Sequence, residues 1–161
     1  MNSIQKWMWK VCCLAAGKKC ARAAQELAAQ ADKFEGLYEP AYLFVQQGQS
    51  IPSPLREWTT RARRISPDGE LAACLQKLSE NPRLQKNPRR QVKGILRLIR
   101  AAGICREKYQ GRALTISSRQ VNAYIALDGH EIHVGETVQV IKAAWYLNGQ
   151  AVEHGLAGEL S

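Results

Sequence analysis

The sequence predicts an α+β protein in which N-terminal and central helices precede a small C-terminal antiparallel β-domain. Apolar residues recur at helical spacing over most of residues 3–33 and 54–103. From Gly111 onward the apolar period falls from 3.6 to 2, the period of a strand with one buried face. In this part of the chain Asp128-Gly129 and Asn148-Gly149 separate apolar runs. Both dipeptides favour two-residue hairpin turns, because Asn, Asp and Gly tolerate a positive φ.

Length and composition limit the class of protein. A chain of 161 residues that is 45% hydrophobic can bury a core in one or two modest domains. We divide it into segments 1–53, 54–110 and 111–161. Its five cysteines are odd in number, irregularly spaced and without a secretory signal, which favours a reducing compartment. A cytoplasmic location is therefore expected.

The first 25 residues contain five basic residues and no acid. On a helix, one face would carry a set of apolar residues, namely Ile4, Trp7, Met8, Val11 and Ala15. Such a helix can dock on the rest of the protein, lie on a membrane surface or serve as a targeting segment. The apolar run from Trp7 to Ala16, interrupted by Lys10, is too short to span a bilayer.

Further helices follow in order. An Ala-rich helix is expected over 20–33, then a connector over 38–53 with one short helix at 41–47. Four Ser-Pro or Asn-Pro pairs predict helix starts. The Ser or Asn side chain can cap free backbone N–H groups, and Pro fits the first helical position because it has no N–H group to leave unsatisfied. The four pairs are Ser53-Pro54, Ser66-Pro67, Asn81-Pro82 and Asn87-Pro88. They predict helices near 54–65, 69–79 and 88–103, with a turn at 81–87.

The basic charge is concentrated in the middle of the chain. The three segments hold six basic against four acidic residues, fourteen against five, and three against five. Four of the cations fall on one face of the 88–103 helix, and we call them the basic ridge: Arg90, Lys93, Arg97 and Arg100. The opposite face is apolar: Val92, Ile95, Leu96 and Ile99. We expect the ridge to face solvent or a partner, either nucleic-acid phosphates or an acidic protein.

Strands are expected from about residue 113 onward. Two hairpins are predicted, with strands 121–127 and 131–134 around Asp128-Gly129, and strands 138–147 and 150–156 around Asn148-Gly149. The third strand carries apolar residues on both faces. Part of its second face must therefore be covered by the helices, by a second copy in a homodimer or by a partner.

Two runs in this region, Gly135–Ile141 and Trp145–Val152, carry a family resemblance. They resemble the end of the GrpE family of nucleotide exchange factors, where a strand, an aromatic residue, a short turn and a return strand close a small β-domain. The stretch before them fits the same register, with a helix ending at 98–104 followed by Gly111, Leu114 and Arg119. The resemblance covers about residues 88–160. It implies a protein that binds the ATPase domain of a DnaK-type chaperone.

The sequence also departs from the family pattern. Leu114, Ile116 and Arg119 stand where the family's Phe-Asp-Pro-x-x-His motif has its Phe, Pro and His. Gln150 and Glu153 stand where the family usually has basic residues, and the family's long acidic N-terminal coiled coil has no counterpart here. Because surface changes alter recognition more readily than fold, these departures bear on the chaperone contact more than on the β-domain.

No catalytic or metal-binding constellation is evident. His130 and His133 lie beside a predicted β-turn, where residues three apart point to opposite faces and cannot share one metal ion. Cys12, Cys13 and Cys20 lack another ligand at metal-binding spacing. There is no phosphate-binding Gly-rich loop and no Gly-x-Ser-x-Gly motif. We therefore expect a protein that is not an enzyme and needs no cofactor or metal.

The sequence thus favours a protein-binding adaptor or co-chaperone. A basic nucleic-acid-associated protein and a structural subunit of a larger assembly are the alternatives. The expected partner surface is the second hairpin: Trp145, Tyr146, Leu147, Asn148, Gly149, Gln150 and Glu153. Trp145 has the alternative role of a core residue. With Trp7, Trp9 and Trp58 it gives the chain four tryptophans, which we expect to be partly exposed.

Overall fold

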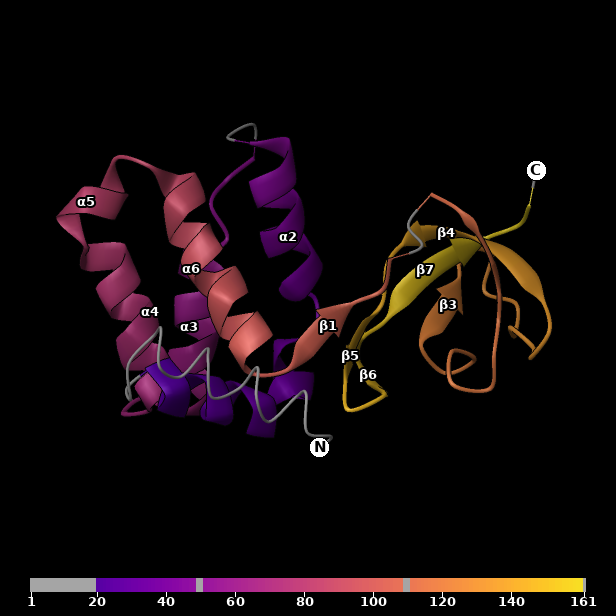
Figure 1. The fold of residues 1–161 in the computed structure, drawn as a ribbon, viewed down its shortest axis with the longest axis horizontal. Helices are drawn as coiled ribbons and strands as arrows, with labels where there is room; N and C mark the ends of the chain where they lie inside the picture. Colours follow the sequence, from indigo (N-terminus) through magenta and orange to yellow (C-terminus); the bar gives the residue numbers. More distant parts are fainter. Residues whose placement is uncertain (1–19, 49–50, 109–110, 161) are drawn as a thin grey trace. The chain divides into compact units, whose positions relative to one another are not determined.

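The computed structural model describes residues 20–48, 51–108 and 111–160, and it has the predicted α+β fold (Figure 1). Helices occupy the N-terminal and central parts, and strands occupy the C-terminal part. The chain forms two compact units, the first ending at Ile104 and the second beginning at Cys105. The predicted N-terminal helix face lies outside the described residues.

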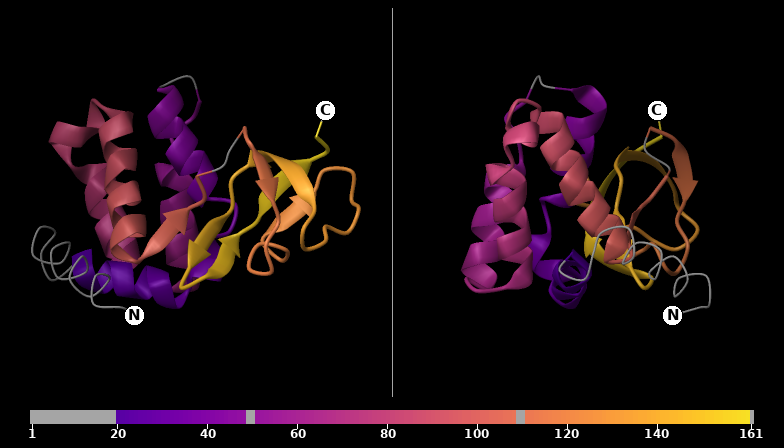
Figure 2. Two further views of the ribbon diagram at one scale, coloured as in Figure 1. Left: turned by 45° about the vertical axis from the view of Figure 1, so that its right-hand side comes forward. Right: turned by 60° about the vertical axis from the view of Figure 1, so that its left-hand side comes forward.

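The described part of the first unit is mainly helical (Figure 2). Residues 20–29 form a helix, followed by a short 3₁₀ helix and five α-helices. These are η1 (Ala31–Phe34), α2 (Tyr38–Gln47), α3 (Leu55–Ile65), α4 (Glu70–Glu80), α5 (Pro82–Gln85) and α6 (Pro88–Ala101). The predicted helices are confirmed to within a few residues, and the predicted turn at 81–87 contains α5. Because α2 packs on α6, residue 53 does not separate two units.

The Asn-Pro helix starts act as predicted. The Asn81 side chain accepts a hydrogen bond from the Arg83 N–H at 3.0 Å, and Asn87 accepts one from the Arg90 N–H at 3.1 Å. These bonds satisfy donors that the first turn of a helix leaves free.

Helix α4 is capped differently from its prediction. It begins at Glu70, one residue after its predicted start, but Ser66-Pro67 lies outside the helix, and the carboxylate of Glu26 accepts the Leu71 N–H at 2.9 Å. A Cβ at position 69 would collide with that carboxylate, so Gly69 leaves the space for it. The cap of α4 therefore comes from a residue 45 positions earlier in the chain.

Trp58 lies at the centre of the first unit and is fully buried, so its predicted exposure is wrong. Its ring stacks on Phe34 with centroids 5.2 Å apart and meets the edge of Tyr38 at 5.5 Å. Its indole N–H donates to the Leu37 carbonyl at 3.0 Å. Burial is therefore achieved with the polar end of the ring satisfied, as a buried tryptophan requires.

In the part of the chain that the structure describes, seven short strands form two sheets. One sheet has the order β1-β5-β6, with bounds Ile104–Arg106, Trp145–Leu147 and Gln150–Glu153. The other has the order β2-β4-β7-β3, with bounds Ala113–Thr115, Thr137–Lys142, Gly155–Gly158 and Tyr124–Ala126. Strand β1 begins at Ile104, so the prediction that strands start near residue 113 is wrong.

The hairpin at Asn148-Gly149 is confirmed. Strands β5 and β6 are antiparallel, Leu147 pairs with Gln150, and φ is +52° at Asn148 and +82° at Gly149. Positive values at both central residues are the mark of a type I′ turn, whose twist matches that of the strands it joins.

The hairpin predicted at Asp128-Gly129 is wrong. Strand β3 pairs in parallel with β7 instead, and residues 130–133 form no strand. Asp128 is not among the residues with positive φ, and its carboxylate accepts the His130 N–H at 3.2 Å. The side chain therefore closes a local turn, a conformation that competes with a hairpin for the same residue type.

The two long predicted strands are each divided between the two sheets. The first becomes β4 and β5, with Ala143 and Ala144 fully buried between them. The second becomes β6 and β7. Lys142 and Glu153 end β4 and β6, and their side chains form an ion pair with Nζ and Oε1 3.0 Å apart. Since Glu153 is fully buried, this pair links the two sheets inside the second unit.

Removing the cation of this pair should destabilise the second unit. Lys142→Met leaves the buried Glu153 carboxylate without its cation, and we expect the free energy of unfolding to fall by about 3 kcal/mol. Arg112→Met, at an exposed cation of the same unit, should change it by less than about 0.5 kcal/mol. Urea unfolding of the whole chain measures both. Equal effects of the two substitutions would show that the pair does not stabilise the unit.

The type I′ turn gives a second prediction. Gly149→Ala places a Cβ on a residue with positive φ and should lower the free energy of unfolding by about 1 kcal/mol. Asn148→Gly keeps a residue that tolerates positive φ and serves as the matched control, so we expect its effect to be smaller. The opposite ranking in urea unfolding would contradict the turn assignment.

Candidate functional site

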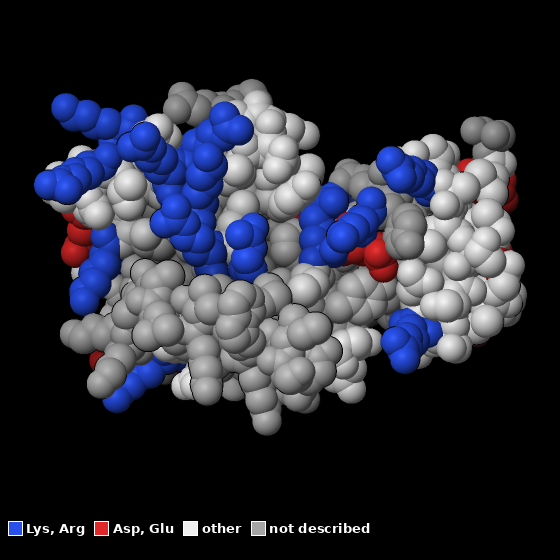
Figure 3. Space-filling model, in the orientation of Figure 1, with Lys and Arg blue, Asp and Glu red and all other residues white. Residues whose placement is uncertain are grey.

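The basic ridge is exposed, as predicted. All four of its side chains point away from the core, while Val92, Ile95 and Ile99 on the other side of α6 are buried. Leu96 is only half-buried, and Leu98 is buried in its place. Figure 3 shows Lys and Arg side chains gathered over α5 and α6.

The hairpin surface is smaller than predicted. Asn148, Gly149 and Gln150 are exposed and Leu147 is partly exposed, so these four residues form an accessible tip. Trp145 and Glu153 are buried, which is incompatible with the surface role predicted for them. The burial of Trp145 supports its alternative role as a core residue, and the Glu153 carboxylate forms an ion pair with Lys142.

Tyr146 also faces inward. Its ring packs against the core of the second unit, and its hydroxyl is buried without a hydrogen-bond partner among the described residues. Burial raises the pKa of this hydroxyl above its ordinary value of 10.0. The Tyr146 ring therefore packs beneath the hairpin and is not part of the accessible tip.

The outer face of the four-stranded sheet is an apolar surface that sequence reasoning placed only in general terms. Ile125 in β3 and Ile141 in β4 are exposed. Residues next to them in the same strands are buried on the other side of the sheet. Ile125 pairs with the partly exposed Leu156 on β7. Leu127, which continues β3, is 68% exposed. We call Ile125, Leu127, Ile141 and Leu156 the apolar face.

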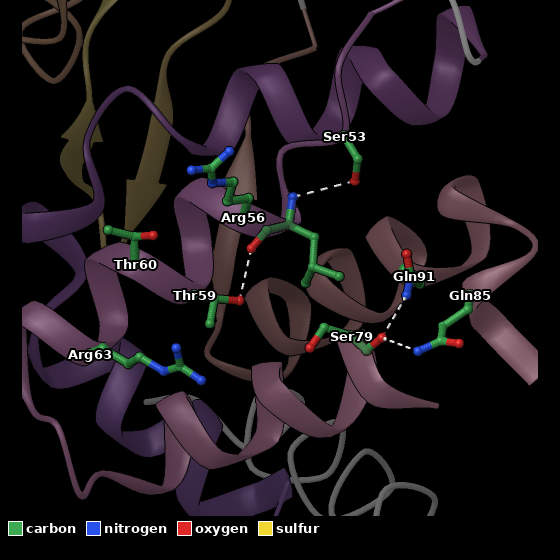
Figure 4. Close-up of a pocket in the computed structure, with 9 residues that line it drawn as sticks. Ser53, Arg56, Thr59, Thr60, Arg63, Ser79, Gln85 and Gln91 are labelled. Carbon is green, nitrogen blue, oxygen red and sulfur yellow. Dashed lines mark hydrogen bonds between the residues drawn. The ribbon is translucent and has the colours of Figure 1, made fainter. Parts of the chain in front are cut away.

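An open groove of about 570 Å³ lies in the first unit between α3, the end of α4 and the start of α6 (Figure 4). Arg56, Thr59, Thr60 and Arg63 line it from α3, and Ser79, whose carbonyl accepts hydrogen bonds from two glutamine amides, lines it from α4. The described residues that line the groove include no carboxylate, imidazole or thiol. It therefore offers hydrogen-bond donors but no general base or metal ligand.

His130 lies between two carboxylates in the loop after β3. Its Nδ1 is 2.6 Å from Asp128 Oδ1, and its Nε2 is 2.8 Å from Glu136 Oε1. The hydrogen bond to Asp128 and then that to Glu136 raise the pKa of His130 above its ordinary value of 6.5. The hydrogen bond with the His130 ring lowers the pKa of the Asp128 carboxyl, and the His133 N–H first and the His130 ring second lower the pKa of the Glu136 carboxyl.

Cys20 and Cys74 lie side by side, with their sulfur atoms 3.7 Å apart. Burial first, and the neighbouring Cys20 second, raise the pKa of Cys74 to about 12. A thiol with such a pKa stays protonated at neutral pH and is a poor nucleophile. Sequence spacing missed this pair because 54 positions separate the two residues.

Over residues 20–48, 51–108 and 111–160, no three His, Cys, Asp or Glu side chains are placed to hold a metal ion. No helix in the same ranges has the length and apolar character needed to cross a membrane. Comparison of the chain with protein-family models, with curated proteins and with solved structures found no match. The GrpE-like resemblance therefore stays a prediction.

The His130 contacts predict a pH dependence. The raised pKa of His130 stabilises the loop below pH 6.5, and this contribution is lost as the pH rises through the raised value. The lowered carboxyl pKa values act in the other direction, because their contribution is lost as the pH falls through them. The loop should therefore be most stable between about pH 4.5 and 6.5.

An NMR titration of the His130 ring protons measures this directly. We expect a pKa above 6.5 in the intact protein and a lower value in the Glu136→Gln variant, which keeps the shape of the side chain but loses its charge. A His130 pKa at or below 6.5 in the intact protein would contradict the geometry of the loop.

Proposed function

We propose that the protein is a non-enzymatic adaptor of the nucleotide-exchange-factor type, whose second unit binds the ATPase domain of a DnaK-type chaperone. The observation that carries the proposal is the location of exposed apolar side chains. Among the described residues, five of the six large apolar side chains that are exposed belong to the second unit: Ile125, Leu127, Val134, Ile141 and Leu160. Exposed apolar surface of this kind is typical of a protein-binding site.

The residues of the GrpE-like resemblance lend support. They form a strand, a buried aromatic residue, a two-residue turn and a return strand, in the order that the resemblance implies. The rigid turn holds the tip at Leu147–Gln150, and the apolar face supplies the larger contact area. A protein partner could use either surface, because neither is needed to satisfy the core.

A purified chaperone ATPase domain loaded with a fluorescent ADP analogue tests the proposal by stopped flow. The intact protein should accelerate ADP release. The double substitution Ile125→Ser and Leu127→Ser, at side chains that are 53% and 68% exposed, should reduce the acceleration about fivefold or more at a fixed concentration. Gln150→Ala tests the tip separately.

Ile51→Ser is the matched control, because Ile51 is the one exposed large apolar residue in the described part of the first unit. We expect this substitution to leave the acceleration of ADP release unchanged. Failure of the intact protein to change ADP release would overturn the exchange activity. A dimer in sedimentation velocity that the Ile125→Ser and Leu127→Ser changes dissociate would show instead that a second copy covers the apolar face.

A further inference from the structure

A second surface of the protein has the opposite chemistry. From residue 81 to residue 106 the sequence contains no acidic residue. Over the same stretch α5, α6 and the turn between them carry seven cations, and all seven side chains are exposed: Arg83, Lys86, Arg89, Arg90, Lys93, Arg97 and Arg100. We call these seven residues the basic face. It extends the four-residue ridge toward the start of α6 and onto α5 (Figure 3).

Helix α6 presents five of the seven cations in a fixed array. Its apolar side is buried through Val92, Ile95, Leu98 and Ile99, and Asn87 caps its first turn, so the helix is fixed at both its face and its start. The ten residue steps from Arg90 to Arg100 span about 15 Å along the axis. A linear array of this length matches a linear polyanion better than a small anion.

The cations of the basic face are not used inside the fold. Within the residues that the structure describes, no hydrogen bond or ion pair engages their side chains. The basic residues of α3 differ, because Arg61 donates to the Lys33 carbonyl at 2.8 Å and Arg63 donates to Gln76 at 2.9 Å. Packing therefore explains part of the charge of α3 but none of the charge of the basic face.

The composition of the face favours phosphate. Five of its seven cations are arginines, and one planar guanidinium group can donate two parallel hydrogen bonds to two oxygens of a phosphate. Membrane-surface helices insert their apolar side into the lipid, and the apolar side of α6 is already buried in the core. Nucleic acid presents phosphates in a regular line and needs no apolar insertion.

We propose that the basic face binds the phosphate backbone of nucleic acid without reading its sequence. The inference is independent of chaperone binding, since it concerns the first unit alone. Side chains that reach only phosphates release counterions on binding, so the affinity depends on salt and hardly on base sequence.

Fluorescence anisotropy with the intact chain tests the proposal, using two labelled 20-base-pair DNA duplexes of unrelated sequence. We expect similar affinities for both and a steep linear fall of log affinity with log salt. The triple substitution Lys93→Gln, Arg97→Gln and Arg100→Gln should reduce the magnitude of that slope by about 3, one for each lost phosphate contact.

The matched control removes the same charge from exposed cations elsewhere, through Arg64→Gln, Arg112→Gln and Arg119→Gln. It should leave the slope nearly unchanged, and circular dichroism should show that both variants fold. Equal losses in the two variants would overturn the proposal, because they would reflect net charge alone. So would equal or tighter binding to phosphatidylserine vesicles or to polyglutamate at the same salt concentration.

Discussion

The second unit depends on one buried charge. Glu153 is completely removed from solvent, and a carboxylate in that position is tolerated only where a cation and hydrogen-bond donors reach it. Lys142 supplies the cation from the last residue of β4, in the other sheet. The pair therefore restricts how the two sheets can be arranged, because any bend of the chain that separates the two residues leaves Glu153 buried without Lys142.

This constraint explains why neither long apolar run stays in one sheet. The chain leaves β4 after Lys142, passes through two fully buried alanines and enters β5. It returns through β6 to Glu153 and then enters β7 beside β4. At this crossing Gly155 has Tyr124 and the Lys142 carbonyl so close that a Cβ would collide with them. Strand β7 can then pair with β3, and the outer side of that sheet carries the apolar face.

The sequence predicted features that depend on neighbouring residues and missed those that depend on distant ones. The Asn-Pro helix starts and the basic ridge were found because capping and helical spacing are local. Asp128-Gly129 and Asn148-Gly149 have equal turn chemistry, yet only the second joins a hairpin, since β7 pairs with β3 from about thirty residues away. Burial of Trp58 and Glu153 likewise depends on partners that no local pattern indicates.

The two candidate surfaces differ in the force that would bring a partner to them. The first unit, over residues 20–104, has fourteen basic and eight acidic residues, whereas residues 105–161 have five and six. Contacts of the basic face are electrostatic and weaken as salt rises, but contacts of the apolar face depend on area removed from water and persist or strengthen. Because the charge and the exposed apolar groups lie in different units, one chain can engage a polyanion and a protein by separate means. A partner whose affinity falls as salt rises is therefore expected to bind the helices. A partner whose affinity does not fall is expected to bind the β-strands.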